Sequence, residues 1–560
     1  MATGEPRRAT AYSPRLIYLG AGFVLALLTL PLLWDGFGSQ GASGRVELTR
    51  PGIRTLGPTA GVDSDAGGPT ADGVPGGGVQ ALGSEPWPWR LDPRLKSQVG
   101  AAVQHFSSDA AAVSQGKANP SNVQVTVHVR DLDRHEIVLD IEGQRPMRPA
   151  SNQKLITCAA ALVLLGPNAQ FVTSIEALGA VGDGVLLGDL IVRADGDPLY
   201  LEGGDGSLDP WLDPVADSLL AAGICRVPGG LVLDEGSYAL PEPGPGWPAA
   251  RDHWQEYCAL SGGFSANAGC LTSWVTPGRV GRNADVLVLP RGHGLPRKGS
   301  VVTGARGANL DVRVGANQWG LTVGGSIPAD TKSGSWRFAH PDPVDLFGHA
   351  VIEGLDRRGV SVEGGFRRER DRPAGRLVAQ FTTALSSYLV PILTHSNNSV
   401  ADQVFLHLGA KVAHRGDRFG GSLATQRALE ILGIAPLGFV QVDGSGLSRD
   451  NRVSASQLTA LIAAVMDRED GSAIQFLEAL PLAGLRGSLE RRLTGQSTKG
   501  RVWGKTGFIN GTSALSGVVR TSSERTLAFS ILVEYRVTPG LNTRCWKPMQ
   551  DRICSLLVSL

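Results

Sequence analysis

The stretch that decides the fold is MRPASNQKLITCAAALVLLGP, residues 147–167, which begins more than a quarter of the way into a chain of 560 residues. It places Lys154 three residues after Ser151, and small and apolar residues follow until Gly166-Pro167 ends the run. This pattern predicts a helix that begins near Ser151 and ends at the glycine. Ser151 is then either a nucleophile with its base one turn away or an ordinary polar residue at the start of a buried helix.

The nucleophile interpretation makes chemical demands on Lys154. A serine hydroxyl attacks well only when a base takes its proton, and a lysine three residues further along a helix reaches it. The lysine must have its pKa lowered by burial or by nearby positive charge. A second Ser-x-x-Lys, Ser114 to Lys117 in SQGKANP, contains a glycine and precedes a proline, so we do not expect it to be helical.

Two further motifs favour the catalytic interpretation. HSNNSVADQ holds Ser396 and Asn398 between helical stretches, and in WGKTGFING the triplet Lys505-Thr506-Gly507 opens an alternating strand pattern. Decoys with the same residue types lack these surroundings: Ser265-Ala266-Asn267 and Lys332-Ser333-Gly334. Order and context together select the motifs at 151, 396 and 505.

The remaining pattern predicts a mixed α/β body split by an insertion. Residues 123–143 alternate as a β-hairpin, residues 383–413 are helical, and strands followed by a helix end the chain. Between these parts, short strands with Gly, Asp and Pro turns predict β-rich modules. We expect a catalytic first part at 86–167, inserted modules at 168–365 and a catalytic second part at 366–560.

The N-terminus predicts export. Residues 1–35 carry arginines and then LIYLGAGFVLALLTLPLLW, residues 16–34, which is long and apolar enough to span a bilayer. A cleaved signal peptide with a poor cleavage site near Ala42 is the alternative. Residues 36–85 are rich in Gly and Pro, and this composition predicts a flexible tether. The bulk of the chain is therefore expected on the periplasmic or cell-wall side, tethered to the cytoplasmic membrane by residues 16–34.

Charge and cysteine usage narrow the function classes. A net charge of +1 gives no basic field for nucleic acid. Six cysteines leave fifteen full pairings open, although Cys545 and Cys554 are out of phase on one helix and are not expected to pair within it. Cys158 is expected to be a buried free thiol. No cluster has metal-ligand spacing, and we expect no metal or organic cofactor.

Ser-x-x-Lys, Ser-x-Asn and Lys-Thr-Gly in this order resemble the penicillin-recognising serine acyl-transfer enzymes. The large insertion after the first motif, together with DGSGLSRDNRVSA at 443–455, is similar to class C low-molecular-mass penicillin-binding proteins, the D-alanyl-D-alanine carboxypeptidases and endopeptidases of the DacB type. The resemblance covers residues 88–560. It implies an α/β (α+β) penicillin-recognising serine-transferase fold, β-lactamase-like, with inserted β-rich modules.

The resemblance implies a role for each catalytic motif residue. Ser151 attacks a D-alanine carbonyl in a peptidoglycan stem peptide and forms an acyl-enzyme, with Lys154 as its base. Ser396, in contact with Lys505, relays a proton to the leaving amine. Asn398 bonds the amide on the acyl side. β-Lactams, which resemble the D-alanyl-D-alanine end, are expected to acylate Ser151 and inhibit the enzyme.

The resemblance also implies substrate-binding positions. Lys505 and Thr506 meet the terminal carboxylate, and Gly507 is a further substrate-binding position. The backbone N–H groups of Ser151 and Phe508 form the oxyanion hole. Three further candidates follow from the family: Arg449 for the carboxylate, Asn510 where relatives can carry glutamine, and Asp234 for the amine of a diaminopimelate side chain. A solvated aspartate at a strand end is the alternative interpretation of Asp234.

Two other functions use the same motifs. A non-catalytic penicillin-binding-like scaffold would tolerate loss of a motif residue, yet every one is present. A β-lactamase or esterase would need a dedicated carboxylate that activates water, and none is visible in the sequence. The motifs leave open the balance between carboxypeptidase and endopeptidase activity, since both cleave a D,D-peptide bond.

Overall fold

The computed structural model describes residues 87–113, 122–538 and 541–560. The predicted anchor at 16–34, the tether at 36–85 and the decoy pair Ser114 and Lys117 lie outside this range. Within the described residues, no helix combines the length and the apolar character that crossing a bilayer requires.

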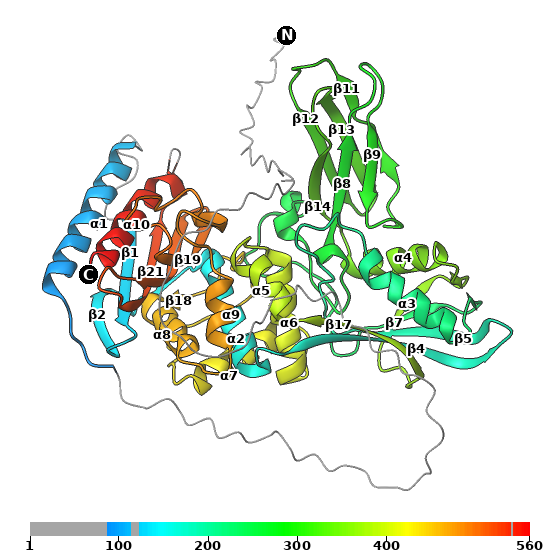
Figure 1. Ribbon diagram of the computed structural model, residues 1–560, viewed down its shortest axis with the longest axis horizontal. Helices are drawn as coiled ribbons and strands as arrows, with labels where there is room; N and C mark the ends of the chain where they lie inside the picture. The colour runs from blue at the N-terminus through cyan, green and yellow to red at the C-terminus, as the bar shows by residue number, and fades with distance from the viewer. Residues whose placement is uncertain (1–86, 114–121, 539–540) are drawn as a thin grey trace, which may run out of the picture. The chain divides into compact units, whose positions relative to one another are not determined.

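The two ends of the described chain build one antiparallel sheet. Its strand order is β19 (Val502–Ile509), β20 (Thr512–Arg520), β21 (Thr526–Tyr535), β1 (Val123–Asp131) and β2 (Glu136–Ile141). The β1–β2 hairpin predicted from alternation is confirmed, and β1 pairs along its whole length with β21 (Figure 1). A smaller pair joins β3 (Pro146–Met147) to β18 (Val453–Ser454). Residues on either side of the insertion thus form a single unit.

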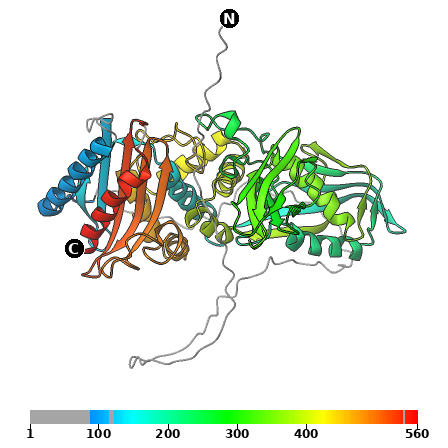
Figure 2. The same ribbon diagram turned by 90° about the horizontal axis from the view of Figure 1, so that it is seen from above.

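Alternating residues of the sheet enter two different cores. Leu527, Phe529 and Ile531 pack with α1 (Pro93–Val113) and α10 (Thr543–Val558). These two helices lie side by side in both views, blue beside red (Figures 1 and 2). Ala528 and Leu532 pack against helices on the other face. The sheet is therefore covered on both faces, as its period of two requires.

A group of helices fills that second core. Its members are α2 (Gln153–Leu165), α5 (Ser386–Leu393), α6 (Asn398–Ala413), α7 (Arg418–Ile431), α8 (Ala455–Met466) and α9 (Ser472–Glu478). Every residue of α2 from 153 to 162 is buried, which marks it as the central helix. The helix predicted after Ser151 is confirmed, but it begins at Gln153, after a 3₁₀ turn at Ala150–Asn152, and its first turn has no side-chain cap.

The insertion has its own core and three sheets. The largest contains β4 (Gln170–Gly182), β5 (Val185–Arg193), β6 (Arg226–Val227), β7 (Leu231–Asp234), β15 (Ser361–Val362), β16 (Phe366–Glu369) and β17 (Arg376–Ala384). A second contains β8 (Cys270–Thr276), β9 (Asp285–Leu289) and β14 (Gly334–Ala339). The third contains β10 (Arg297–Lys298), β11 (Val302–Gly304), β12 (Asp311–Asn317) and β13 (Gly320–Pro328).

The insertion differs from the sequence-based expectation in two respects. Its largest sheet continues to Ala384, because β17 pairs with β4, so the insertion ends about twenty residues beyond the expected position 365. It also contains two helices, α3 (Asp209–Ala221) and α4 (Pro343–Asp356). The sequence does carry a signal for the start of α4, because Asp342 caps the helix through Val344 N and a proline follows in the first turn. The prediction missed this helix because the surrounding sequence is rich in turn residues.

Candidate active site

Ser151 lies in the 3₁₀ turn that leads into α2, at the junction of three chain segments. Ala150, just before it, has a positive φ of 46°, which non-glycine residues seldom adopt. A Cβ on Gly446 would lie 1.8 Å from the Ala150 carbonyl oxygen, and one on Gly507 would lie 2.8 Å from that of Pro149. Two glycines therefore let a loop and a strand close around the serine.

Lys154 is completely buried and contacts three oxygen atoms. Its Nζ lies 3.2 Å from Ser151 Oγ, 2.7 Å from Asn398 Oδ1 and 2.6 Å from the carbonyl oxygen of Ser445. Amide and carbonyl oxygens only accept hydrogen bonds, whereas a hydroxyl also donates. A neutral amine can donate to the two acceptors and direct its lone pair at the Ser151 hydroxyl. The geometry suits a base.

Burial lowers the pKa of Lys154, while the charges of Asp402 and Asp443 oppose that shift. Asp402 lies on α6 and accepts from Ser445 N at 2.8 Å, so it is linked to Lys154 through the backbone of one residue, Ser445. Burial first, and then Asp443, raises the pKa of Asp402 itself. Neither carboxylate makes a direct ion pair with the lysine, which favours the neutral amine.

The Ser396 motif lies at the start of α6. Ser396 has a φ of 61°, and such backbone conformations cluster at functional sites. Asn397 caps the helix through Val400 N, and Asn398 faces Lys154 with its carbonyl oxygen. The amide nitrogen of Asn398 donates to the carbonyl oxygen of Tyr257, in the insertion, at 2.8 Å. The insertion thus reaches the edge of the site.

The Lys505 motif lies within β19 rather than at its start. Lys505 is buried, and its Nζ donates to Ser396 Oγ at 2.9 Å and to the Thr506 carbonyl oxygen at 3.0 Å. Burial, and then the charge of Lys154, lowers the pKa of Lys505 well below its ordinary value. Thr506 Oγ1 donates to Ser488 Oγ at 2.8 Å. The three motifs therefore meet, with each lysine on a different serine.

The motif at 443–455 forms the support of Lys154. Asp443 accepts from Gly446 N at 2.8 Å and Ser448 N at 2.6 Å, which folds the loop and presents the Ser445 carbonyl to the lysine. Arg449 is exposed, and its carbonyl accepts from Arg148 Nε at 3.2 Å. The guanidinium of Arg449 is thus on the surface of this loop, accessible to a ligand.

Two other candidates lie at the far end of β19. Phe508 follows Gly507 with its side chain 45% exposed, and Asn510 lies exposed in the turn between β19 and β20. The backbone of Phe508 is therefore beside the serine turn that Gly507 approaches. Asn510 lies three residues after Gly507, beyond the end of the strand.

Asp234 does not face the site, and the expectation of a diaminopimelate contact is wrong for it. Its carboxylate is buried, with Arg193 Nη1 at 2.6 Å, and it accepts from the backbone of Gly236, Asp371 and Arg372. The alternative of a solvated strand end is also wrong. Both interpretations of Asp234 are wrong because its partner, Arg193 on β5, is distant in the sequence.

Sequence reasoning missed several residues of the site. Asp402 and Ser445 stand inside quoted motifs, but only the fold shows that they contact each other and support Lys154. Ser488 and Tyr257 carry no local signal. Cys158, expected as a buried free thiol, is buried beside both lysines, and burial raises its pKa.

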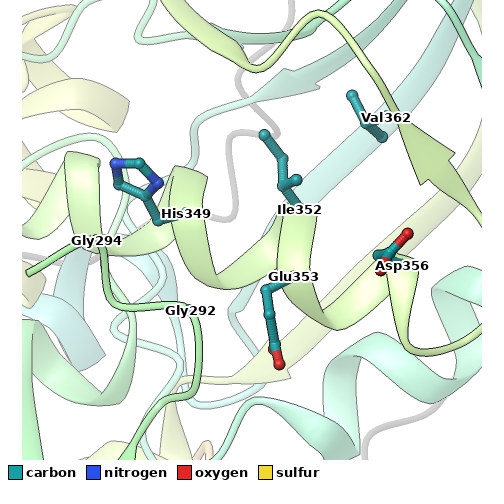
Figure 3. A pocket seen from close by; sticks show the side chains of 7 residues that line it. All are labelled: Gly292, Gly294, His349, Ile352, Glu353, Asp356 and Val362. Atoms are coloured by element: carbon teal, nitrogen blue, oxygen red, sulfur yellow. The ribbon is translucent and has the colours of Figure 1, made fainter.

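A separate cavity lies along α4 of the insertion. It has a volume of about 400 Å³, and Figure 3 shows His349, Ile352 and Glu353 of α4 lining it with Gly292 and Gly294. None of the three motifs reaches it. Across the described part of the chain, no three or more His, Cys, Asp or Glu side chains are grouped to hold a metal ion.

Comparison with known proteins gives consistent matches. The model of the D-Ala-D-Ala carboxypeptidase 3 (S13) family matches residues 109–549. A D-alanyl-D-alanine carboxypeptidase of Actinomadura sp. is 33% identical over 462 residues, which covers 79% of this chain and 83% of the relative. D-alanyl-D-alanine carboxypeptidase DacB of Haemophilus influenzae is 26% identical over 438 residues, 76% of this chain and 88% of the relative.

Solved structures show the same fold. Penicillin binding protein 4 (dacB) of Haemophilus influenzae has a TM-score of 0.65 at 22% identity, covering 81% of this chain and 97% of that chain. A second structure of it, complexed with a β-lactam, has a TM-score of 0.60 at 22% identity and covers the same 81% and 97%. The expected fold class, mixed α/β with inserted modules, is confirmed.

Proposed function

The chain belongs to the D-Ala-D-Ala carboxypeptidase 3 (S13) family and is a serine D,D-peptidase of the DacB type, and we propose the roles of its residues on that premise. It hydrolyses a D,D-peptide bond of a peptidoglycan stem peptide through an acyl-enzyme on Ser151. The observation that carries the assignment is the contact set of Lys154, two pure acceptors and one hydroxyl. The scaffold and β-lactamase alternatives are not favoured.

Acylation uses the two lysines in sequence. The lone pair of Lys154 takes the Ser151 proton as Oγ bonds to the carbonyl carbon. Ser396, held by Lys505, gives its own proton to the nitrogen of the leaving group and receives in return the proton that Lys154 took, so both groups regain their starting states. The C–N bond breaks and the amine departs. Backbone N–H groups of Ser151 and Phe508 stabilise the oxyanion. Water then cleaves the ester, and Ser151 recovers its proton.

Substrate binding follows from the same arrangement. Lys505 and Thr506 hold the terminal carboxylate, and Gly507 allows the strand to approach the serine turn. Asn398 bonds the acyl-side amide. The exposed Arg449 is a second cation for the carboxylate, and Asn510 contacts only the outer part of a bound substrate. A β-lactam, which carries a strained amide beside a carboxylate, occupies the same positions.

Labelling with fluorescent penicillin tests this proposal. Wild type is expected to form a covalent adduct, because the leaving group of a β-lactam stays tethered and hinders water. Ser151→Ala is expected to abolish the adduct, whereas Ser114→Ala, the decoy, is expected to leave it unchanged. Labelling of the Ser151→Ala protein would show that another residue is the nucleophile.

Digestion of purified muropeptides distinguishes the two peptidase activities. Release of D-alanine from monomeric pentapeptides identifies carboxypeptidase action, and conversion of cross-linked dimers to monomers identifies endopeptidase action. Both bonds have a D-alanine carbonyl on the acyl side, so we expect Ser151→Ala to remove both activities together. Retention of either one by this variant would contradict a shared site.

We also propose that the enzyme is exported and faces the cell wall from a membrane anchor at residues 16–34. The support is the apolar length of this segment behind three arginines and the Gly- and Pro-rich stretch that follows. Membrane fractions washed with alkaline carbonate should retain the full chain. Release of the enzyme by that wash, or an N-terminus near Ala42, would favour a cleaved signal peptide.

A further inference from the structure

A shallow pocket lies in the insertion, beside the segment that meets the active site. Its volume is about 230 Å³, and it is lined by Trp254 and by residues of the β12–β13 hairpin. The hairpin residues are Val314, Gly315, Ala316, Asn317, Gly320 and Thr322. No step of the reaction above uses this pocket.

The pocket combines a flat apolar wall with polar groups. Trp254 is 38% exposed, and its indole packs against the hairpin at Gly315, where an added Cβ would lie 3.5 Å from the ring, in van der Waals contact. Asn317 and Thr322 add an amide and a hydroxyl. Trp319, 73% exposed, follows on the turn that closes the hairpin. Exposed indoles beside hydrogen-bonding groups suit a ligand with one apolar face and a polar rim.

The pocket is close to the acyl side of the active site. Tyr257 accepts from Asn398 through its carbonyl oxygen, and Trp254 precedes Tyr257 by only three residues. Three residues span at most about 11 Å even when fully extended. The pocket is thus within reach of a stem peptide bound at Asn398, because four extended residues of such a peptide cover about 14 Å.

We propose that this pocket binds an N-acetylated amino sugar of the glycan strand to which the stem peptide is attached. The inference rests on the proposed function, because it places the acyl side of the substrate at Asn398. The sugar ring packs its C–H face on the exposed part of the Trp254 indole, while its amide and hydroxyl groups meet Asn317 and Thr322. The insertion would thus bind the polymer and the catalytic unit would cleave its peptide.

Two variants test the pocket by different means. Trp254→Ala removes the wall, and Gly315→Val keeps the indole but displaces it, because the added methyl groups would occupy the space where the ring packs. Each is assayed on a free pentapeptide and on the same pentapeptide attached to its disaccharide. We expect KM to rise about 3- to 10-fold for the disaccharide substrate, the range that one aromatic contact contributes, and the loss to be confined to that substrate.

A matched control and three outcomes make the test decisive. Trp89→Ala removes an indole that is more exposed, at 51%, from another part of the chain and is expected to leave KM for both substrates unchanged. Equal losses on both substrates would assign Trp254 to the peptide and overturn the proposal, as would no loss on either. If wild type hydrolyses neither substrate and takes no penicillin, the proposed function fails instead.

Discussion

Lys154 in the active site and Arg193 in the insertion are both basic side chains with two carboxylates nearby, but only Arg193 contacts its carboxylates directly. Arg193 bonds Glu176 at 2.8 and 2.9 Å and Asp234 at 2.6 Å. Lys154 touches only neutral oxygens. Hydrogen bonding to Glu176 raises the pKa of Arg193, whereas burial lowers that of Lys154.

This difference separates a structural charge from a reactive one. Direct pairing fixes the charged state of Arg193 and ties β5 to β4 and β7. Keeping Asp402 and Asp443 one contact away leaves Lys154 buried without a counter-ion in reach, and that arrangement makes its proton removable. The two residues also differ in type and burial, since Lys154 is completely buried and Arg193 is partly exposed, and the contacting atoms act in the same direction as these differences.

The largest expected effect comes from making Lys154 permanently charged. Lys154→Arg keeps a cation that cannot lose its proton near neutral pH, so the acylation rate should fall about 10²–10⁴-fold, the usual contribution of a general base. Stopped-flow penicillin labelling measures it. Lys411→Arg, which keeps a partly exposed ion pair with Asp195, should label at the wild-type rate. Near-normal labelling of Lys154→Arg would show that Lys154 is not the base.

The second expected effect is on stability and belongs to the insertion. Asp234→Asn leaves a donor facing Arg193 and three backbone N–H groups, so the free energy of unfolding should fall by about 1–3 kcal/mol. Thermal denaturation measures this change, while penicillin labelling of the folded protein should be unchanged. Glu142→Gln, in an exposed pair, is the control and should shift Tm little. A loss of labelling without a loss of stability would show that Asp234 does act in the active site.

A third test alters the distant charge on Lys154. Asp402→Asn removes a negative charge that raises the lysine pKa, so that pKa should fall and more neutral amine should be present at a given pH. The acidic limb of kcat/KM should therefore move to lower pH, by up to about one unit. Because the pKa of Asp402 is itself raised, the shift should be clearest at neutral pH and above. A limb that moves to higher pH would contradict this electrostatic coupling.

The smallest expected effect concerns a neutral contact. Ser488→Ala removes the acceptor of the Thr506 hydroxyl, which should then lose its orientation toward the substrate carboxylate. KM for a D-alanyl-D-alanine peptide should rise about 2- to 5-fold, consistent with one hydrogen bond, with kcat nearly unchanged. Steady-state kinetics measure both constants. A fall in kcat alone would place Ser488 in proton transfer.

The sequence predicts the catalytic unit well because its signals are local. Ser-x-x-Lys on a helix, alternation from 123 to 143 and the strand around Lys505 each depend on neighbours in the chain. The helix that follows Ser151, the β1–β2 hairpin and the C-terminal helix α10 all occur where the pattern predicts them. Local periodicity and motif order were sufficient for these elements.

Other features could not be read from the sequence because their partners are distant. The sequence suggests that Asp234 is a free carboxylate at a strand end, because its partner Arg193 is distant in sequence. The pairing of β5 with β7 places Arg193 beside it. The end of the insertion was placed too early because β17 resembles any short strand, and only its pairing with β4 assigns it. Asp402 was inside a recognised motif, yet its relation to Lys154 depends on Ser445, on a loop that is separate in the sequence.

The strand order of the catalytic sheet also constrains how the polypeptide is made. β1 must pair with β21, and Asp131 on β1 pairs with Leu527 on β21, 527 − 131 = 396 residues further along the chain. During synthesis from the N-terminus, the largest sheet of the insertion is complete once Ala384 has emerged, while the β1–β2 hairpin still has an open edge. Open strand edges promote aggregation. A premature stop anywhere before β21 therefore leaves the outer edge of β1 without its partner strand.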